Sequence, residues 1–409
     1  MTNVFDELQV RGFVQQVTHP EVLKERLRTE RLTFYVGFDP TANSLHIGHL
    51  LPIMAMVHMQ RAGHRPIAIL GGGTAMVGDP SGRTEMRQML ARQTIADNAQ
   101  RLQAQLQRYL TSTGDNSARV LDNAEWLAEL RYIDFLRDIG RHFSVNRMLT
   151  FETYKQRLET GLSFLEFNYQ LLQAYDFLVL HERYGCVLQL GGDDQWGNMV
   201  AGADLIRRVH QQEAYAMTFP LLTTASGQKM GKTAAGAVWL DAEQLSAYEF
   251  YQFWINVDDR DVGRLLRLYT LLPLAEIARL QALQGAEVRQ AKEVLAFEVT
   301  ALTHGREAAQ TAQQTSQAMF QGTGAATGVP QTTLPRERLE AGISVVDLFA
   351  ESGLAASKGA ARRLIQQGGA SLNGIRVGDV EVMVSSADVQ EGALLLRAGK
   401  KRYHRVMVV

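Results

Sequence analysis

The sequence Tyr35-Val36-Gly37-Phe38-Asp39-Pro40-Thr41-Ala42-Asn43-Ser44-Leu45-His46-Ile47-Gly48-His49 joins an apolar run to the start of a helix. The apolar run over residues 32–38 predicts a buried strand, and two histidines spaced i, i+3 follow its polar loop. A helix N-terminus after a strand offers unpaired N–H groups and positive potential to a phosphate chain, and imidazoles donate to phosphate oxygens. Gly48 has no Cβ, so a flat base or ribose can lie against the backbone there. The pattern indicates a nucleotide site; a surface His-X-X-His or a metal-binding pair would show the same spacing.

Short apolar runs alternate with helical patterns over residues 1–220. The predicted strands are residues 32–38, 66–70, 119–121 and 186–190. The predicted helices are an amphipathic segment within residues 1–30 and residues 49–61, 87–109, 132–140, 164–180 and 199–209. This alternation, with glycine-rich turns, is typical of an α/β protein with a doubly wound parallel, Rossmann-like sheet. Ligands of such sheets bind at the carboxyl ends of the strands.

The character of the sequence changes after residue 220. Residues 221–320 contain a polar lysine loop and then helical periodicity, which predict a small α-helical domain. Residues 321–336 are punctuated by Gly, Thr and Pro without periodicity, so we interpret them as a linker. Residues 337–409 have an apolar pattern of their own, which predicts a small α+β module. Residues 1–220 would then form the first, Rossmann-like domain, which is the candidate for a catalytic domain because ligands of such sheets bind at its strand ends.

The composition excludes several classes of protein. The 409 residues include 42 Lys and Arg and 43 Asp and Glu, so the overall charge does not indicate nucleic acid, although a local basic region can be hidden. Cys186 is the only cysteine, which excludes an internal disulfide and a multi-cysteine zinc site. The N-terminus lacks the features of a signal peptide, and no apolar run reaches the roughly 18 residues of a membrane span. We therefore expect a cytoplasmic protein.

A polar stripe runs through the apolar segment over residues 164–178. Tyr169, Gln173 and Asp176 are spaced i, i+4 and i+7, so they follow one face of a helix. Polar groups in apolar surroundings cost free energy unless each has a partner. The stripe indicates either a pocket wall for a polar small molecule or the exposed face of an amphipathic helix.

Two glycine-rich turns carry acidic residues. Asp79, in Gly78-Asp79-Pro80-Ser81-Gly82-Arg83, could receive an ammonium group, although a plain turn needs no function; Arg83 and Arg87 add positive charge nearby. The turn Gly191-Gly192-Asp193-Asp194-Gln195-Trp196-Gly197-Asn198 follows a predicted strand, where an acid suits ribose hydroxyls. Its two neighbouring acids would indicate magnesium only if both converged on one ion.

A lysine pair lies in the polar loop over residues 225–236, in the motif Lys229-Met230-Gly231-Lys232-Thr233. Two lysines in a flexible loop can close over a departing pyrophosphate and neutralise the charge that grows in the transition state. Ordinary solvated lysines are the alternative. A P-loop is not indicated, because no Gly-x-x-x-x-Gly-Lys-[Ser/Thr] precedes a helix after a strand.

The C-terminal module is locally basic. Lys358, Arg362 and Arg363 lie on a predicted short helix, and Lys400-Lys401-Arg402-Tyr403-His404-Arg405 lies near the end of the chain. Such a patch fits contact with a phosphate backbone, and a solvated charged surface would also explain it.

Together these motifs resemble those of bacterial tyrosyl-tRNA synthetases, which are class I aminoacyl-tRNA synthetases, over essentially the whole chain. His46-Ile47-Gly48-His49 resembles the first class I signature, and residues 229–233 resemble the second, Lys-Met-Ser-Lys-Ser, with Gly231 and Thr233 in place of the serines. Residues 343–409 resemble the small RNA-binding module of a small-subunit ribosomal protein and some pseudouridine synthases. The resemblance implies a tyrosine–tRNA ligase. It would activate L-tyrosine with ATP to tyrosyl-adenylate plus pyrophosphate, then transfer tyrosine to the 3′-terminal ribose of tRNA(Tyr).

The resemblance also implies a role for each candidate residue. The implied catalytic residues are Thr41, His46, His49, Arg83, Arg87, Lys229, Lys232 and Thr233. The implied tyrosine-binding residues are Tyr35, Asp79, Tyr169, Gln173, Asp176 and Gln195, with Tyr35 and Asp176 at the phenol. The implied ATP-binding residues are Gly37, Asp39, His46, Gly48, His49, Gly192, Asp194 and Lys232. The implied RNA-binding residues are Lys358, Arg362, Arg363, Lys400, Lys401 and Arg402.

The resemblance further implies ATP with Mg²⁺ held largely by phosphate oxygens and water, no protein-bound metal, and a homodimer without a membrane. Three other protein classes share part of the pattern. A tryptophanyl-tRNA synthetase must satisfy an indole N–H and generally lacks the C-terminal module. A small-molecule nucleotidylyltransferase has a His-X-X-His signature but is usually shorter. A non-catalytic RNA-binding or splicing factor derived from a synthetase would not need both signatures.

Overall fold

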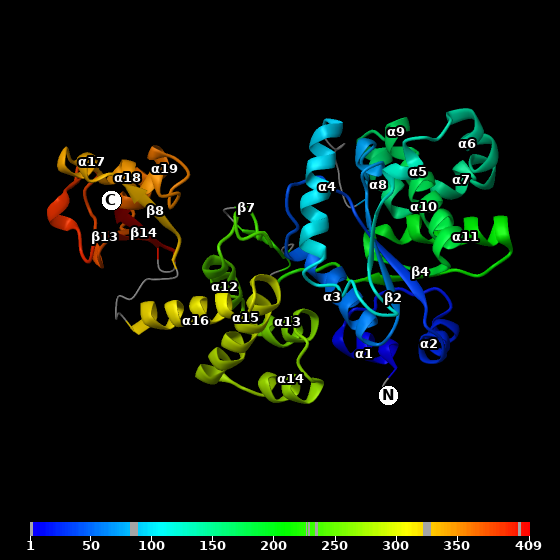
Figure 1. Cartoon of the computed structure of the whole chain (residues 1–409), viewed down its shortest axis with the longest axis horizontal. Helices are drawn as coiled ribbons and strands as arrows, with labels where there is room; N and C mark the ends of the chain where they lie inside the picture. The colour runs from blue at the N-terminus through cyan, green and yellow to red at the C-terminus, as the bar shows by residue number, and fades with distance from the viewer. Residues whose placement is uncertain are drawn as a thin grey trace. The chain divides into compact units, whose positions relative to one another are not determined.

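The computed structural model describes residues 3–81, 89–225, 227, 230–233, 236–321, 329–399 and 402–409, and of residues 232, 233, 320 and 321 only the backbone. Contacts group the chain into two compact units (Figure 1). Unit 1 comprises Met1–Asp241 and Asp258–Ala282, and unit 2 comprises Ala242–Val257 and Leu283–Val409. The four-part division at residues 220, 320 and 336 stays a prediction.

Unit 1 is built on a parallel sheet of five strands in the order β3-β2-β1-β4-β5. The strands are β1 (Thr33–Phe38), β2 (Arg65–Leu70), β3 (Arg119–Asp122), β4 (Cys186–Gly192) and β5 (Tyr215–Phe219). The predicted Rossmann-like parallel sheet is confirmed, and β5 is a strand that the sequence analysis missed. The strand order reverses between β1 and β4, because β2 and β3 follow on the side of β1 and β5 follows on the side of β4. A crevice is therefore expected at the carboxyl ends of β1 and β4.

Most of the predicted helices are found in unit 1, but the helix predicted over 87–109 spans residues 92–106, and the helices over residues 124–127, 145–148 and 152–160 were not predicted. Two further predictions are corrected by the structure. They are α1 (Val4–Arg11), α2 (Pro20–Thr29), α3 (Ile47–Arg61), α4 (Arg92–Leu106), α5 (Ala124–Leu127), α6 (Tyr132–Asp138), α7 (Val145–Met148), α8 (Glu152–Thr160), α9 (Phe164–Phe167), α10 (Tyr169–Tyr184), α11 (Trp196–His210), α13 (Val262–Tyr269) and α14 (Leu274–Gln281). The N-terminal segment forms two helices because Gly12, at φ 92°, ends α1 in the left-handed region. The predicted helix over 164–180 is divided at Asn168, whose side chain donates to the carbonyl of Phe164.

Both faces of this sheet are buried, which explains its continuous apolar strands. On one face, Tyr35, Ile67 and Ile69 belong to a core that includes Phe177 and Leu178 of α10. Helix α3 also contacts β1, β2 and β4. The first signature therefore begins a helix that is packed directly on the sheet.

Unit 2 begins with helices α12 (Ala247–Ile255), α15 (Val288–His304) and α16 (Arg306–Gln321), which pack on one another. Within 242–321, the described residues form helices and no strand, as the predicted helical region requires. Ser246 starts α12 with a capping box to Glu249.

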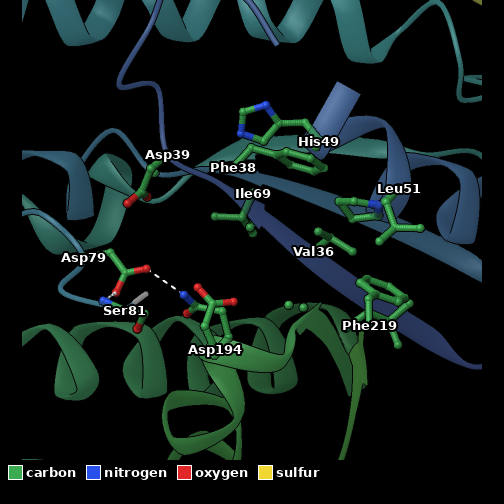
Figure 2. Close-up of a pocket in the computed structure, with 18 of the residues that line it drawn as sticks. Val36, Phe38, Asp39, His49, Leu51, Ile69, Asp79, Ser81, Asp194 and Phe219 are labelled. Carbon is green, nitrogen blue, oxygen red and sulfur yellow. Dashed lines mark hydrogen bonds between the residues drawn. The ribbon is translucent and has the colours of Figure 1, made fainter. Parts of the chain in front are cut away.

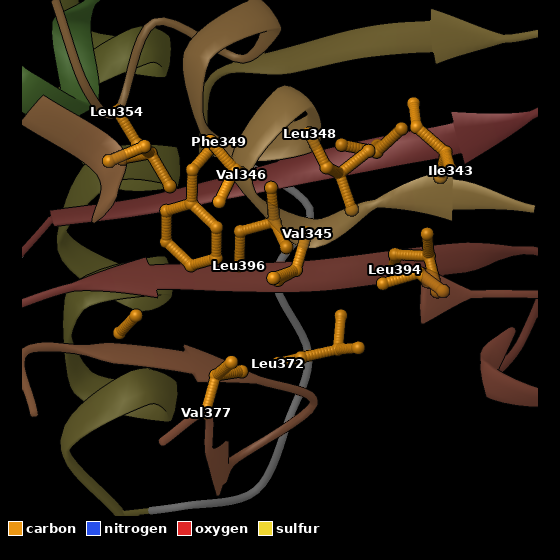
Figure 3. Close-up of a cluster of buried hydrophobic side chains, with 14 of the residues drawn as sticks. Ile343, Val345, Val346, Leu348, Phe349, Leu354, Leu372, Val377, Leu394 and Leu396 are labelled. Carbon is orange, nitrogen blue, oxygen red and sulfur yellow. The ribbon is translucent and has the colours of Figure 1, made fainter. Parts of the chain in front are cut away.

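The C-terminal module has the predicted α+β character. Its main sheet has the order β11-β10-β13-β14-β8. The elements are β8 (Gln331–Leu334), α17 (Arg336–Glu340), β9 (Ile343–Ser344), α18 (Val345–Glu351), α19 (Lys358–Gln366), β10 (Ala370–Leu372), β11 (Ile375–Arg376), β12 (Met383–Val384), β13 (Ala393–Ala398) and β14 (Arg402–Val408). Figure 3 shows Phe349, Val345 and Leu396 within its own apolar core.

One correction concerns the predicted linker. Gln331–Leu334 lies within residues 321–336 but forms β8, which pairs with β14 in parallel. Residues 322–328 lie outside the described residues. Among the described helices, we find none with the length and apolarity needed to cross a bilayer.

Candidate active site

A cavity of about 440 Å³ opens where the sheet order reverses between β1 and β4. Every predicted tyrosine- or ATP-binding residue whose side chain is described lines it. These residues are Tyr35, Gly37, Asp39, His46, Gly48, His49, Asp79, Tyr169, Gln173, Asp176, Gly192, Asp194 and Gln195, and the predicted catalytic residue Thr41 also lines the cavity. Tyr169, Gln173 and Asp176 of α10 all line this one cavity, so the polar stripe is a pocket wall and not the solvent-exposed face of an amphipathic helix.

One end of the cavity is a buried phenol and carboxylate pair. The hydroxyl of Tyr35 is buried and has no hydrogen-bond partner among the described residues. Asp176 is only 4% exposed; its two oxygens accept from Asn123 Nδ2 at 2.8 Å and from Trp126 Nε1 at 2.7 Å. Burial raises the pKa of Asp176 to about 7, against the opposing effect of these two donors. This end suits a ligand group that can both donate and accept, such as a hydroxyl.

A hydrogen-bonded group of polar side chains lies further along the cavity. Asp79 accepts from Gln195 Nε2 at 2.7 Å and from the N–H of Ser81 at 2.9 Å. Asn198 Nδ2 donates to Gln173 Oε1 at 3.0 Å, and Tyr169 donates to Asp39 at 2.9 Å. Figure 2 shows Asp79 and Asp194 across the cavity from His49. These oxygen-rich groups suit a cationic ligand group such as an ammonium.

The two signature histidines form the N-terminus of α3. His46 Nδ1 accepts from the N–H of Gly48 at 3.0 Å, and His49 Nδ1 accepts from the N–H of His46 at 3.2 Å. In neutral imidazoles this pattern puts the ring proton on Nε2, so each Nε2 is a hydrogen-bond donor. The ring centroids are 4.0 Å apart. A Cβ on Gly48 would come within 2.8 Å of the His46 ring, so any larger residue would force this ring to shift.

Both acidic residues of the turn after β4 line the cavity. Asp193 Oδ1 also accepts from Gln16 at 2.7 Å and from Thr218 at 2.8 Å. Asp193 thus fixes the turn to β5 and to the segment after α1. A Cβ on Gly192 would come within 2.5 Å of Asp194 Oδ1, so a larger residue there would displace the Asp194 carboxylate.

The second signature is only partly described. Met230 and Gly231 line the cavity, and the backbone of Lys232–Thr233 forms β6, which pairs with β7 (Gly236–Ala237). Lys229, Arg83 and Arg87 lie outside the described residues, as do the side chains of Lys232 and Thr233. Their roles stay predictions.

Two family models cover this chain. Residues 27–321 match the model described as tRNA synthetases class I (W and Y). Residues 322–406 match the model of a tyrosine–tRNA ligase SYY-like C-terminal domain. A protein of Clostridium botulinum named tyrosine–tRNA ligase is 52% identical over 408 residues, with 100% of both chains covered. One of Acetivibrio thermocellus with the same name is 53% identical over 409 residues, again with 100% coverage of both. The chain belongs to the tyrosine–tRNA ligase family.

Solved structures agree with this membership of the tyrosine–tRNA ligase family. A C-terminally truncated mitochondrial tyrosyl-tRNA synthetase of Aspergillus nidulans is 29% identical, covers 78% of this chain and 95% of its own, and has a TM-score of 0.71. A tryptophanyl-tRNA synthetase of Encephalitozoon cuniculi bound to tryptophan is 13% identical over 75% of this chain and 87% of its own, with a TM-score of 0.55. The fold is therefore shared with tryptophan enzymes, and the close relatives identify the tyrosine branch.

The predicted RNA-binding residues of this tyrosine–tRNA ligase family member lie in its C-terminal module. Lys358, Arg362 and Arg363 are exposed on α19. Arg402, at the start of β14, donates to the carbonyl of Gly353 at 3.1 Å, beside the turn that leads to α19. Lys400 and Lys401 lie outside the described residues.

Three residues that hold the site in place were not predicted from the sequence. Asn123 donates to Asp176 and to Thr74 Oγ1, Trp126 donates to Asp176, and Thr74 donates to Asp39 at 2.9 Å. One signal was available, because Asn123 directly follows β3, at the carboxyl edge of the sheet where ligands bind.

Proposed function

We propose that this synthetase forms tyrosyl-adenylate in the cavity between β1 and β4 and then transfers tyrosine to tRNA(Tyr). The carrying observation is the buried Tyr35 hydroxyl, without a partner among the described residues, in a cavity that Asp176 also lines. Burial raises the pKa of Tyr35, and the Asp176 charge is close enough to raise it further. A buried hydroxyl without a partner costs free energy, and a substrate phenol would remove that cost by donating to Asp176 and accepting from Tyr35. Phenylalanine would leave both groups without that partner.

The rest of the amino acid would extend toward the polar group further along the cavity. Its α-ammonium would meet Asp79, Gln173 and Tyr169, which are already fixed by hydrogen bonds to neighbouring side chains. Gln195 would lie by the reacting carboxylate, since it donates to Asp79. Fixed partners reduce the entropy lost when the substrate is oriented for attack.

ATP would enter with its Mg²⁺, held largely by phosphate oxygens and water. The Nε2 donors of His46 and His49 would bind phosphate oxygens, with Thr41 at the cavity mouth, and Gly192 and Asp194 would bind the ribose. Gly37, Asp39 and Gly48 would line the nucleotide. The tyrosine carboxylate attacks the α-phosphorus in line, the bond to the β-phosphate oxygen breaks, and pyrophosphate leaves.

The charge that grows on the leaving pyrophosphate needs positive partners. The chain's candidates are Arg83, Arg87, Lys229 and Lys232, with Thr233 as a hydroxyl donor. No covalent enzyme intermediate is needed, so positioning and charge stabilisation would account for catalysis.

In the second step the 3′-terminal ribose hydroxyl of the tRNA attacks the adenylate carbonyl and AMP leaves. The exposed Lys358, Arg362 and Arg363 of α19, with Arg402 and the predicted Lys400 and Lys401, would bind the tRNA backbone through charge. Because tRNA charging serves translation, we place the protein in the cytoplasm.

We also propose a homodimer, supported by exposed apolar side chains on consecutive helices of unit 1. Ile133 is 71% exposed and Phe164 is 69% exposed. The set, here called the apolar patch, is Tyr132, Ile133, Val145, Leu158, Phe164 and Leu165. Exposed apolar residues gathered on neighbouring elements mark interaction surfaces.

The test is ATP–pyrophosphate exchange with one amino acid at a time. Tyrosine should drive exchange, whereas phenylalanine and tryptophan should drive little. Tyr35→Phe should lower the ratio of the exchange rate with tyrosine to the exchange rate with phenylalanine. Exchange that tryptophan drives better than tyrosine would overturn the proposal.

A further inference from the structure

Helix α13 touches the first signature directly. Tyr269, at the end of α13, is 1% exposed, and its hydroxyl donates to the carbonyl of Ile47 at 3.1 Å. Ile47 is the first residue of α3 and lies between His46 and Gly48 of the signature. The position of the phosphate-binding helix N-terminus is therefore tied to α13.

The other end of α13 holds the segment that leads into the second signature. Asp261, just before α13, is 7% exposed and accepts from the N–H of Ala225 at 2.8 Å. It also accepts from Arg264 at 3.0 Å, and Arg264 donates in turn to the carbonyl of Thr223. A buried carboxylate and a guanidinium thus bind the backbone at residues 223 and 225, shortly before the lysine motif.

The segment after the second signature returns to the first one. The N–H of Ile47 donates to the carbonyl of Val238 at 3.0 Å, and the N–H of Leu240 donates to the carbonyl of Leu45 at 2.8 Å. Gly231, at φ 94°, packs so closely that a Cβ there would come within 2.8 Å of Ile47. Backbone hydrogen bonds therefore tie the first signature to the segment that follows the second, and the close approach of Gly231 to Ile47 joins the two signatures directly.

Arg11, the last residue of α1, holds the C-terminal end of α13 in place. Arg11, 3% exposed and paired with Glu7 at 3.0 Å, donates to the carbonyls of Arg267, Thr270 and Leu272 at 2.8–3.2 Å. These carbonyls at the end of α13 would otherwise lack helical partners. The helix is thus a rigid support rather than a free surface element.

We propose that α13 sets the spacing between the two signatures, with Asp261, Arg264 and Tyr269 as positioning residues for adenylate formation. They act through backbone, Asp261 and Arg264 on Thr223 and Ala225, and Tyr269 on Ile47. The phosphate donors of α3 and the lysine motif must meet one triphosphate, so a small misplacement of either slows the reaction. This inference rests on the proposed function.

The first experiment measures single-turnover tyrosyl-adenylate formation and, separately, tyrosine affinity by equilibrium dialysis. Asp261→Ala and Tyr269→Phe should each lower the rate constant at saturating ATP by about tenfold, with tyrosine affinity unchanged. Asp261→Asn, which keeps an acceptor for one of the two donors, should recover part of the rate. Glu276→Ala is the matched control, because Glu276 also pairs with an arginine at i+3, Arg279, but on α14. It should leave the rate unchanged.

The second experiment separates positioning from general loss of structure. In a protein that already carries Lys232→Ala, Asp261→Ala should not lower the rate constant of adenylate formation further, because the lysine that Asp261 is proposed to position is absent. Losses that multiply in that background, a parallel fall in tyrosine affinity, or an unchanged rate in both Asp261→Ala and Tyr269→Phe would overturn the inference. If thermal melting shows that Asp261→Ala is not folded, the rate constant and the tyrosine affinity of Tyr269→Phe provide the same test, because this substitution removes only one oxygen atom. Absence of tyrosine-dependent exchange in the parent protein would instead overturn the proposed function.

Discussion

The carboxylate of Asp176 is buried, and burial disfavours its ionised form. Burial raises its pKa from 3.8 to about 7, and the hydrogen bonds from Asn123 and Trp126 oppose this rise. The folded protein therefore holds this proton more tightly than the unfolded chain, so the stability that it contributes is present below about pH 3.8 and is lost as pH rises through about 7. A substrate phenol that donates to the ionised carboxylate would favour the opposite form.

Tyrosine should consequently bind more tightly as pH rises from 6 to 8, a range that spans the Asp176 pKa of about 7. Calorimetric titration with tyrosine in the absence of ATP measures this trend. Asp176→Asn, which cannot ionise, should bind weakly and lose most of the pH dependence. Tighter binding at the lower pH would mean that a protonated Asp176 donates to the phenol, and it would contradict the prediction.

Single residues were predictable where a motif coincides with a strand end or a helix face. His46, Asp194 and Gln173 were found this way, and all three line the cavity. Asn123 and Trp126 were not found, because their contact with Asp176 depends on how β3 and the following turn pack beside α10. Sequence spacing does not encode that tertiary neighbourhood.

At the scale of elements, a buried ion pair fixes the turn between α8 and α9. Arg157 donates to Glu166 at 3.1–3.2 Å, and both side chains are at most 3% exposed. Burial raises the pKa of Glu166, but Arg157 and Ser163 together hold it below its ordinary value. Its contribution to stability is therefore present above about pH 4.5 and is lost as pH falls through the lowered pKa.

Arg157→Leu should lower the free energy of unfolding by about 3–5 kcal/mol at pH 7, because it leaves a buried carboxylate without its cation. Urea unfolding followed by tryptophan fluorescence checks this. Arg28→Leu breaks the exposed pair with Glu25, so its cost should stay below about 1 kcal/mol. The difference between Arg157→Leu and the parent should shrink toward acid pH; a constant difference would contradict the linkage.

Elements were predictable where periodicity lasts for several turns or strands. The parallel strands β1, β2 and β4 were found because burial on both faces makes them continuous apolar runs. Strand β5 was missed although Tyr215–Phe219 is buried along its whole length and is longer than the strand predicted over residues 119–121. Strand β8 was missed because its residues become a strand only by pairing with β14.

At the scale of the whole molecule, the C-terminal module has its own core and its own exposed cations. Substituting Lys358, Arg362 and Arg363 together by Gln should weaken tRNA binding. The slope of log K against log salt should become shallower by up to about 2–3 if each contacts a phosphate. Filter binding at several salt concentrations measures the slope. Tyrosine-dependent pyrophosphate exchange should not change, and Arg338→Gln, from the pair with Glu351, is the control in the same module.

The apolar patch makes a different prediction, about assembly. Helices α6, α7 and α8 share a core through Phe135, Met148 and Tyr154, so the outward side chains of these helices are held on one body. Tyr154 extends this body to α9 by donating to the carbonyl of Phe167 at 2.9 Å. A rigid apolar surface of this kind suits a two-fold interface in which each copy presents the same patch.

Ile133→Asp combined with Phe164→Asp should therefore convert a dimer into a monomer, because two carboxylates would be desolvated on each side of the interface. Sedimentation equilibrium should give twice the 45.5 kDa chain mass for the parent and a single chain mass for the variant. Val22→Asp changes a side chain that is 50% exposed on α2, outside the patch, and should leave the dimer intact. A variant that stays dimeric would place the interface elsewhere on the molecule.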